Sequence, residues 1–309
     1  MNVSIIYVNY KTCGLTLSSI RSVKELTEGI SYEIIVVDNH SGDNSLSIIK
    51  EKYSEVICVE SPENIGFSRA NNLGIEIAQG EYILFLNPDT LLMNNAIAIL
   101  YWFLQSSEQT GACGGNLYDE NEQPTKSFGR SFPSFGQELT SIFYLPSFYL
   151  KSPRSQSFNH TDKPLEVAFI LGADLMIKKE ILEKVGKFDP DFFLNYEETE
   201  LCYRIKQAGF KIMSVPAAKV IHLEGRAPYI SKSHLYYFYQ GTFIFFNKKD
   251  GKTSAKKIFQ YIQLKNNIRI IQFTLLMNKR KIHYWKMKKE TAGEAFDSII
   301  NFDYFCKLK

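Results

Sequence analysis

The sequence predicts an α/β fold in which helices cover both faces of a mostly parallel sheet. In the first third of the chain, short apolar runs rich in β-branched residues alternate with segments of helical periodicity. Such alternation at short spacing builds parallel sheets with helices on both faces. The composition agrees, because 45% hydrophobic and 22% charged residues over 309 positions are typical of a globular protein.

The first half of the chain carries the alternation. Apolar runs predict strands at residues 2–10, 33–37, 56–59 and 82–86. Apolar positions at helical spacing, together with capping residues and glycine stops, predict helices at residues 15–28, 44–53, 67–78 and 91–105. Ligands of such sheets bind beyond the carboxyl ends of the strands, so the polar residues after the second and fourth strands mark the expected site.

The chain after residue 105 is less regular. Residues 111–165 are rich in Gly, Pro, Ser, Phe and Tyr with little periodicity, which predicts loops and short strands. The remaining elements are expected to be strands at 166–177 and 211–221 and helices at 178–186 and 197–208.

Positive charge is concentrated late in the chain. Residues 248–289 hold 13 Lys or Arg and one acid, whereas the net charge of the whole chain is only +3, so the rest is net acidic. Apolar residues recur at helical spacing here, which predicts a domain at 1–247 and a basic amphipathic helical extension at 248–309. A membrane surface suits such a segment. A solvated helical face, packing on the domain and a dimer contact are the alternatives, and no oligomeric state is assigned.

The sequence lacks several other signals. The five cysteines are scattered without a C-x-x-C pair, which favours a reducing cytoplasm. The opening residues do not follow the pattern of a signal peptide, and no apolar stretch reaches the 18 or so residues of a membrane span. The basic segment is not accompanied by a recognition motif or stacking platform, so no nucleic-acid partner is expected.

Three groups of residues could carry chemistry. Asn87-Pro88-Asp89 follows the apolar run YILFL, where a carboxylate can ligate a divalent cation or complete a turn. Glu197, Glu198 and Glu200 follow an aromatic run, which suits either a general base beside apolar walls or acids at a helix N-terminus. His222 follows a strand and gains a ligand role only beside other ligands.

Taken together, these blocks resemble the family 2 glycosyltransferases of GT-A fold, especially the bacterial rhamnosyltransferase-like branch. Asn87-Pro88-Asp89 occupies the position of that family's D-x-D metal motif, in the N-P-D form common in the branch, and His222 matches a histidine near the metal. The other matching blocks lie in order between residues 2 and 226: Ile5 to Tyr10, Val36 to Asp43, Asn64 to Phe67 with Ala70, Asn72 and Gly74, Gly172 to Asp174, Gly186 to Asp189, and Phe192 to Arg204.

The resemblance implies an inverting, metal-dependent glycosyltransferase. It would move a sugar from a nucleotide-diphosphate donor to a hydroxyl of a glycan or polyprenyl-linked glycan acceptor in surface polysaccharide (capsule, O-antigen or exopolysaccharide) biosynthesis. The favoured donor is dTDP-rhamnose, with UDP-linked hexoses or galactofuranose as the other candidates. Such an enzyme would act in the cytoplasm, at the inner face of the cell membrane if the basic segment binds there.

The resemblance also implies residue roles. Glu198 would be the general base, with Glu197 beside it, and Asp89 and His222 would hold Mg²⁺ or Mn²⁺. The sugars would contact Gly172, Asp174 and Arg226. The donor nucleotide would contact Val8, Asn9, Tyr10, Asp38, Asn39, Asn64, Gly66, Asn72 and Asn87.

The chain departs from the family pattern at three places. Asn87 replaces the first acid of the D-x-D motif, so metal binding rests on Asp89 with His222. Glu198 and Glu200 stand where aspartates are usual, which keeps each carboxylate and adds a methylene. Arg226 stands where a small hydroxyl residue is common.

Two other functions fit parts of the sequence. A catalytically silent nucleotide-sugar or glycan-binding module is the alternative, and the retained carboxylates and histidine argue against it. A nucleotidyltransferase on a similar sheet would show a Gly-rich phosphate loop near its N-terminus, which the sequence lacks.

Overall fold

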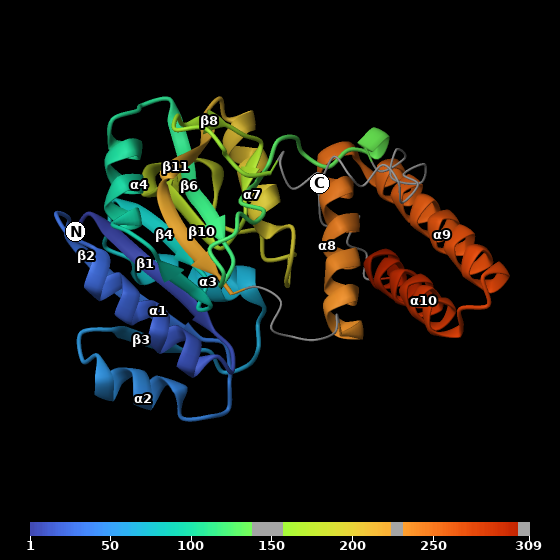
Figure 1. Cartoon of the computed structure of the whole chain (residues 1–309), viewed down its shortest axis with the longest axis horizontal. Coiled ribbons are helices and arrows are strands. Elements are labelled where there is room, and N and C mark those ends of the chain that lie inside the picture. Colours follow the sequence, from blue (N-terminus) through green and yellow to red (C-terminus); the bar gives the residue numbers. More distant parts are fainter. Residues whose placement is uncertain (138–156, 224–230, 302–309) are drawn as a thin grey trace. The chain divides into compact units, whose positions relative to one another are not determined.

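The computed structural model describes residues 1–137, 157–223 and 231–301, which fall into two compact units (Figure 1). The first unit takes in residues 1–132, 157–190 and 198–223 of this part. The second unit takes in residues 133–137, 191–197 and 231–301. The chain therefore leaves the first unit for seven residues directly before Glu198.

A nine-stranded sheet forms the centre of the first unit, in the order β3-β2-β1-β4-β10-β6-β11-β5 with β8 paired to β11. The strands of its first half are β1 (Val3–Asn9), β2 (Tyr32–Asp38), β3 (Ile57–Glu60), β4 (Tyr82–Leu86) and β5 (Thr90–Leu92). Those of its second half are β6 (Thr110–Tyr118), β8 (Leu165–Glu166), β10 (Asp174–Lys178) and β11 (Lys211–His222). Strands β7 (Phe128–Gly129) and β9 (Phe169–Ile170) pair separately.

The sheet is mostly parallel, which confirms the predicted class. Strands β1, β2, β3 and β4 are parallel to one another, and β11 is parallel to β6. Strand β10 runs antiparallel to both of its neighbours, β4 and β6, so β6 and β11 point the same way as β1. Their carboxyl ends, together with the start of β10, therefore meet at one edge, which we call the carboxyl edge.

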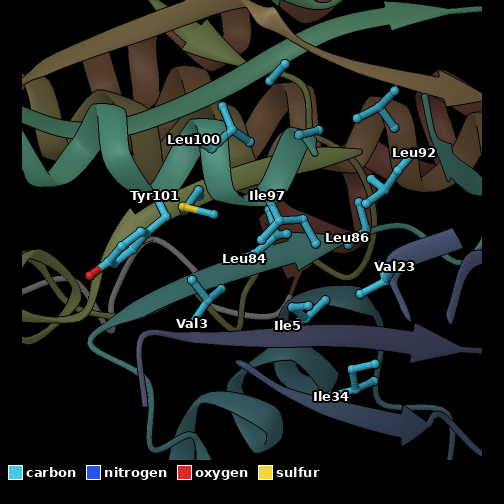
Figure 2. Packing of buried hydrophobic residues seen from close by; sticks show 14 of the residues in the cluster. Val3, Ile5, Val23, Ile34, Leu84, Leu86, Leu92, Ile97, Leu100 and Tyr101 are labelled. Carbon is cyan, nitrogen blue, oxygen red and sulfur yellow. The ribbon is translucent and has the colours of Figure 1, made fainter. Parts of the chain in front are cut away.

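Helices cover both faces because strand side chains alternate between two cores. In β1, Val3, Ile5 and Tyr7 lie in one buried cluster while Ile6 and Val8 lie in the other. Figure 2 shows the first cluster, where β1 side chains meet Leu84 of β4 and residues of the covering helices. The helices of this unit are α1 (Cys13–Leu26), α2 (Ser45–Lys52), α3 (Phe67–Ile77), α4 (Ala96–Gln105), α6 (Lys179–Val185) and α7 (Glu197–Gln207).

Three sequence predictions were wrong. The strand expected at 166–177 is divided among β8, β9 and β10, and β9 pairs outside the main sheet. The expected helix at 91–105 begins only at Ala96, because residues 90–92 pair with β11 as strand β5. Asn94 lies between β5 and α4, where its side-chain amide donates to the Ala217 carbonyl and accepts from the Lys219 N–H of β11. Within the region expected to be irregular, β6 is a nine-residue strand that lies between β10 and β11.

Glycines explain why β6 lacks a strand pattern. A Cβ on Gly115 would lie 2.6 Å from Ala218 O, and one on Gly114 would lie 2.3 Å from a carbon of Ile170. Close backbone approach therefore selects residues that carry no β-propensity.

The second unit is built on three helices, α8 (Lys232–Asp250), α9 (Lys252–Leu275) and α10 (Lys279–Asn301), which pack on one another. Their core is aromatic: the Phe259 and Phe296 rings stack with centroids 4.1 Å apart, and Phe243 contacts Phe296 edge-on at 5.2 Å. Because α8 packs with the later helices, this unit takes in residues that the sequence division at 247 assigned to the first domain. No helix within the described ranges is both long and apolar enough to cross a bilayer.

Candidate functional site

The polar ends of β1 and β2 are joined by a buried network. Asn9 and Asp38 face each other in register, and the Asn9 amide donates to Asp38 Oδ1 at 2.6 Å. The Asp38 carboxylate also accepts from the Ser41 backbone N–H at 2.8 Å and from its hydroxyl at 2.6 Å. Asn9 and Asp38 are 0% and 5% exposed, so these side chains shape the loop after β2.

A second link ties that loop to the one after β3. Asn39 donates to Asn64 Oδ1 at 2.9 Å and accepts from the Ile65 backbone N–H at 2.9 Å. Gly66 is the N-cap of α3 and has φ +82°, a backbone conformation that residues with a side chain rarely adopt. The structure thus brings Asn9, Asp38, Asn39, Asn64 and Gly66 together.

Three other residues expected at the nucleotide lie differently. Val8 is buried within β1 and contributes to a core cluster, whereas Tyr10 follows the strand and is 43% exposed. The Asn72 amide bonds both ways to the Phe188 backbone, donating to its carbonyl at 2.8 Å and accepting from its N–H at 3.1 Å. Asn72 therefore anchors the loop before Pro190.

The loop after β4 brings Asn87 and Asp89 to the end of β11. His222 Nε2 lies 3.3 Å from Asp89 Oδ1 and 3.5 Å from Asn87 Nδ2. The Leu223 N–H donates to the Asp89 carbonyl, so the backbones are joined as well. Two segments 135 residues apart thus present an amide, a carboxylate and an imidazole at the carboxyl edge.

A buried hydroxyl chain supports this loop. Thr90 Oγ1 donates to the Asn87 carbonyl at 2.7 Å and meets Ser19 Oγ at 3.2 Å. Ser19 Oγ in turn lies 2.9 Å from the Tyr7 hydroxyl, and all three hydroxyl residues are 0% exposed. These hydroxyl groups fix the turn beneath Asp89, whose side chain stays 26% exposed beside His222.

The donor set at this edge fits a divalent cation. A carboxylate oxygen and an imidazole nitrogen are accepted ligands of Mn²⁺, and the carboxylate also suits Mg²⁺. Among residues 1–137, 157–223 and 231–301, no three His, Cys, Asp or Glu side chains are placed so that they could hold a metal ion together. Asp89 and His222 would therefore hold the ion together with oxygens of a bound diphosphate or water.

Asp174 begins β10, directly opposite Leu86, and is 1% exposed. Its Oδ2 accepts from the Gly115 N–H at 2.6 Å, while its Oδ1 accepts no hydrogen bond from the described residues. Burial raises the pKa of Asp174 to about 7, against the opposing effects of the Gly115 hydrogen bond and the His222 charge. Because Asp174 is buried, it can influence the site only through the groups that it holds in place, such as Gly115.

Asp174→Asn is expected to change the pH dependence of stability. The folded pKa of Asp174 exceeds its ordinary value of 3.8, so the folded state binds the proton more tightly. Its contribution is present at low pH and is lost as the pH rises through about 7. The free energy of unfolding of the wild type, relative to Asp174→Asn, should fall by up to about 4 kcal/mol from about pH 4 to about pH 8. Urea unfolding in EDTA checks this, and parallel pH profiles of the two proteins would contradict it.

Glu198 lies on α7 beside the break between β9 and β10. A Cβ on Gly172 would lie 3.8 Å from the Glu198 side chain, which is an ordinary contact distance, so the two residues are neighbours. Burial raises the pKa of Glu198, and the positive charge of Lys126 works against that rise. The Asn87 N–H donates to the Ala173 carbonyl. This bond connects the break between β9 and β10 to the loop after β4, which carries Asp89.

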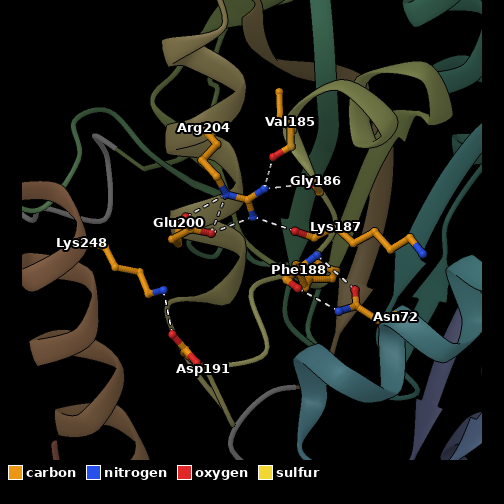
Figure 3. A network of polar contacts seen from close by, with 9 residues as sticks. All are labelled: Asn72, Val185, Gly186, Lys187, Phe188, Asp191, Glu200, Arg204 and Lys248. Atoms are coloured by element: carbon orange, nitrogen blue, oxygen red, sulfur yellow. Dashed lines mark hydrogen bonds and ion pairs between the residues drawn. The ribbon is translucent and has the colours of Figure 1, made fainter. Parts of the chain in front are cut away.

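Glu200 has a different role from its neighbours. Its carboxylate receives the Arg204 guanidinium at 2.8 to 2.9 Å (Figure 3). Arg204 also donates to the carbonyls of Val185, Gly186 and Lys187, at 2.6, 3.0 and 2.7 Å. The Glu200–Arg204 pair therefore joins α7 to the loop after α6. The Glu200 carboxylate has this structural role and is not a candidate general base.

Residues 191–197, in the second unit, lead into Glu198. Lys248 of α8 pairs with Asp191 at 2.7 Å (Figure 3), and the Phe193 and Tyr237 rings stack at 4.2 Å. Asn195 and Tyr196 both have positive φ, +72° and +73°, which is costly for residues with a Cβ. Strain of this kind is retained where the surroundings over-determine a site, and here it directly precedes the two glutamates.

Some site residues lie beyond these observations or were missed. Arg226 lies outside the described residues. Glu197 is 5% exposed at the start of α7. Sequence reasoning missed Ser41, Thr90 and Lys126, which contact or influence partners distant in the chain, namely Asn9, Ser19 and Glu198. Serine and threonine near strand ends are too common to signal such roles.

Comparison with known proteins gives one family. The family described as "Glycosyl transferase family 2" matches residues 4–186. The chain is 28% identical to the low-salt glycan biosynthesis hexosyltransferase Agl10 of Haloferax volcanii, over 92% of this chain and 87% of that protein. It is 24% identical to the dTDP-rhamnosyl transferase RfbF of Shigella flexneri, over 92% of both chains.

A solved structure agrees on the fold. The mannosyltransferase PcManGT from Pyrobaculum calidifontis, in complex with GDP-Man and Mn²⁺, superposes with a TM-score of 0.57 at 15% identity. The similarity covers 98% of this chain and 87% of that one. At this identity the likeness supports the GT-A architecture alone.

Proposed function

Because the chain belongs to glycosyl transferase family 2, whose match spans more than half of its length, we propose that it is an inverting glycosyltransferase that uses a nucleotide-diphosphate sugar. The single observation that carries the proposal is the convergence at the carboxyl edge. Asp89 and His222 lie 3.3 Å apart there, and Asn87 is linked through Ala173 to the break that Glu198 faces. Diphosphate binding and proton abstraction need these two kinds of group close together.

The donor binds along the ends of β1, β2 and β4. The loops ordered by Asn9, Asp38 and Asn39 receive the nucleoside, and Asn87 donates toward the diphosphate. Asp89 and His222 hold Mg²⁺ or Mn²⁺, which when bound neutralises the negative charge of the departing nucleoside diphosphate.

The transfer is one displacement. The Glu198 carboxylate accepts the proton of an acceptor hydroxyl while that oxygen forms its bond to the anomeric carbon. The bond from this carbon to the diphosphate oxygen breaks at the same time, and the nucleoside diphosphate leaves with the electron pair. Attack from the opposite side inverts the anomeric centre. Gly172 lies beside the Glu198 side chain and contacts the sugar there, and Glu197 helps to orient the acceptor.

The favoured donor is dTDP-rhamnose, and the acceptor is a glycan or polyprenyl-linked glycan used in surface polysaccharide biosynthesis. Support for this donor comes from the N-P-D sequence at Asn87 to Asp89 and from the similarity to a dTDP-rhamnosyl transferase over nearly the whole chain.

A thermal-shift screen tests the proposal. The purified chain is melted with dTDP, UDP or GDP, each with and without Mn²⁺. Ligand at about 100 times its Kd stabilises the folded state by roughly 2.7 kcal/mol, so a true donor nucleotide should raise Tm by several degrees. We expect a Mn²⁺-dependent rise that is largest with dTDP. A larger rise with UDP or GDP would replace the donor, and no rise with any nucleotide in folded protein would favour a silent module.

A further inference from the structure

The hairpin formed by α9 and α10 exposes an apolar tip. The two helices pack along each other and are joined at residues 276–278 (Figure 1). From Asn267 to Glu290 no residue is buried, although the same helices bury Ile258 and Phe296 at their other end. We call residues 264–289 the hairpin tip. Its exposed apolar side chains include Leu264, Ile268, Ile271, Leu275, Leu276 and Met277, with Leu275 at 80% and Met277 at 87% exposure.

All of the acidic and basic residues in the hairpin tip are basic. It carries eight Lys or Arg residues, and no acid occurs between Asp250 and Glu290. Several cations lie against aromatic rings, with Lys281 4.7 Å from the Phe273 centroid and Lys288 4.9 Å from that of Trp285. Burial, and then the like charge of Lys265, lowers the pKa of Lys288. Positive charge is therefore crowded here and attracts an anionic partner.

We propose that the hairpin tip docks on an anionic lipid surface. Leu275, Leu276 and Met277, at the turn, enter the boundary between headgroups and acyl chains. Lys279, Arg280 and Lys281 follow the turn directly and meet the lipid phosphates, and Trp285 takes the interfacial position that amphipathic rings prefer.

The chemistry of the tip favours a bilayer over other occupants. Nucleic acid would be met by cations and stacking rings, not by three exposed aliphatic side chains at a convex turn. A second copy would bring another tip of the same charge, and the two would repel. A bilayer accepts apolar insertion and positive charge together.

The docking goes beyond the proposed sugar transfer and does not depend on it. A polyprenyl-linked acceptor resides at such a surface, so docking would hold the enzyme where its acceptor is. Vesicle binding and nucleotide binding are measured separately, and the failure of one leaves the other standing.

The test uses the full chain with phosphatidylcholine vesicles that do or do not contain phosphatidylglycerol. We expect binding only to the anionic vesicles, weakening as salt is raised. Lys279→Glu with Arg280→Glu and Lys281→Glu should lower the apparent affinity by about 100-fold or more. A matched triple of exposed lysines, Lys52→Glu with Lys163→Glu and Lys184→Glu, makes the same charge change and should lose far less.

Apolar insertion has its own readout. In a Trp102→Phe background Trp285 is the single tryptophan, and its emission should shift to the blue on binding anionic vesicles. Leu275→Gln with Leu276→Gln and Met277→Gln should abolish that shift without lowering Tm, because these side chains are exposed. Three results would overturn the proposal. They are equal vesicle binding by the two charge-reversal triples, no binding by the wild type at low salt, and a wild-type dimer that the glutamine triple makes monomeric.

Discussion

Glu198→Gln is expected to lower kcat for sugar transfer by roughly 10²–10⁴-fold, the usual contribution of a general base. Glutamine keeps the size and the hydrogen-bonding oxygen of the side chain but cannot take up the hydroxyl proton. Because Glu198 lies beside Gly172 at the acceptor side, the nucleotide-induced rise in Tm should stay as in the wild type. Initial rates with donor and acceptor, together with that rise, measure both quantities.

Glu200→Gln is the matched control. Its carboxylate binds Arg204 and so fastens α7 to the loop after α6. Loss of this charge should lower Tm while kcat of the folded fraction changes far less than in Glu198→Gln. A normal kcat in Glu198→Gln would contradict the assignment and transfer the role to Glu197.

The pH profile gives an independent test of the same residue. The base acts as a carboxylate, so the rate should rise with pH through the pKa of Glu198, which burial has raised above its ordinary value. Lys126→Ala removes a positive charge that lowers this pKa, and should therefore move the rising limb to higher pH. An unmoved limb would mean that another group titrates in the reaction.

The elements that depend on local pattern could be predicted from the sequence. Strands β1, β2 and β4 are short, strongly apolar runs, and each was predicted within two residues at either end. The polar residues beyond them were also correctly placed at one edge, because parallel strands require it. The family followed from several short motifs in order, and the match over residues 4–186 confirms it.

What depends on distant partners could not be predicted. Strand β6 is rich in glycine because Ala218 and Ile170 approach its backbone too closely for a Cβ. The local sequence gives no signal of that approach. Local pattern did not distinguish the three glutamates after Tyr196. The family resemblance assigned the base role to Glu198, and the Arg204 contacts show the separate structural role of Glu200. In the basic segment, helical periodicity was visible, but the exposure of Leu275 to Met277 depends on where the packing with α8 ends.

The second large effect is expected from Asp89→Ala, which removes the carboxylate that lies 3.3 Å from His222 Nε2 at the carboxyl edge. Charge stabilisation by a bound cation is worth several kcal/mol at a phosphoryl leaving group, so kcat should fall by roughly 10²–10⁴-fold. The Mn²⁺-dependent part of the nucleotide-induced rise in Tm should disappear with it. Both losses should resemble the effect of EDTA on the wild type.

Asn87→Asp is the informative partner variant because it restores the first acid of a D-x-D sequence. Asn87 Nδ2 lies 3.5 Å from His222 Nε2, so a carboxylate at this position would join the same donor set. Without metal, two neighbouring carboxylates repel and Tm should fall; with Mn²⁺ the added charge should tighten binding and restore it. If instead Asp89→Ala kept its Mn²⁺-dependent response and Asn87→Asp gained none, the cation would be held elsewhere. The diphosphate charge would then have to be met by the protein's own donors.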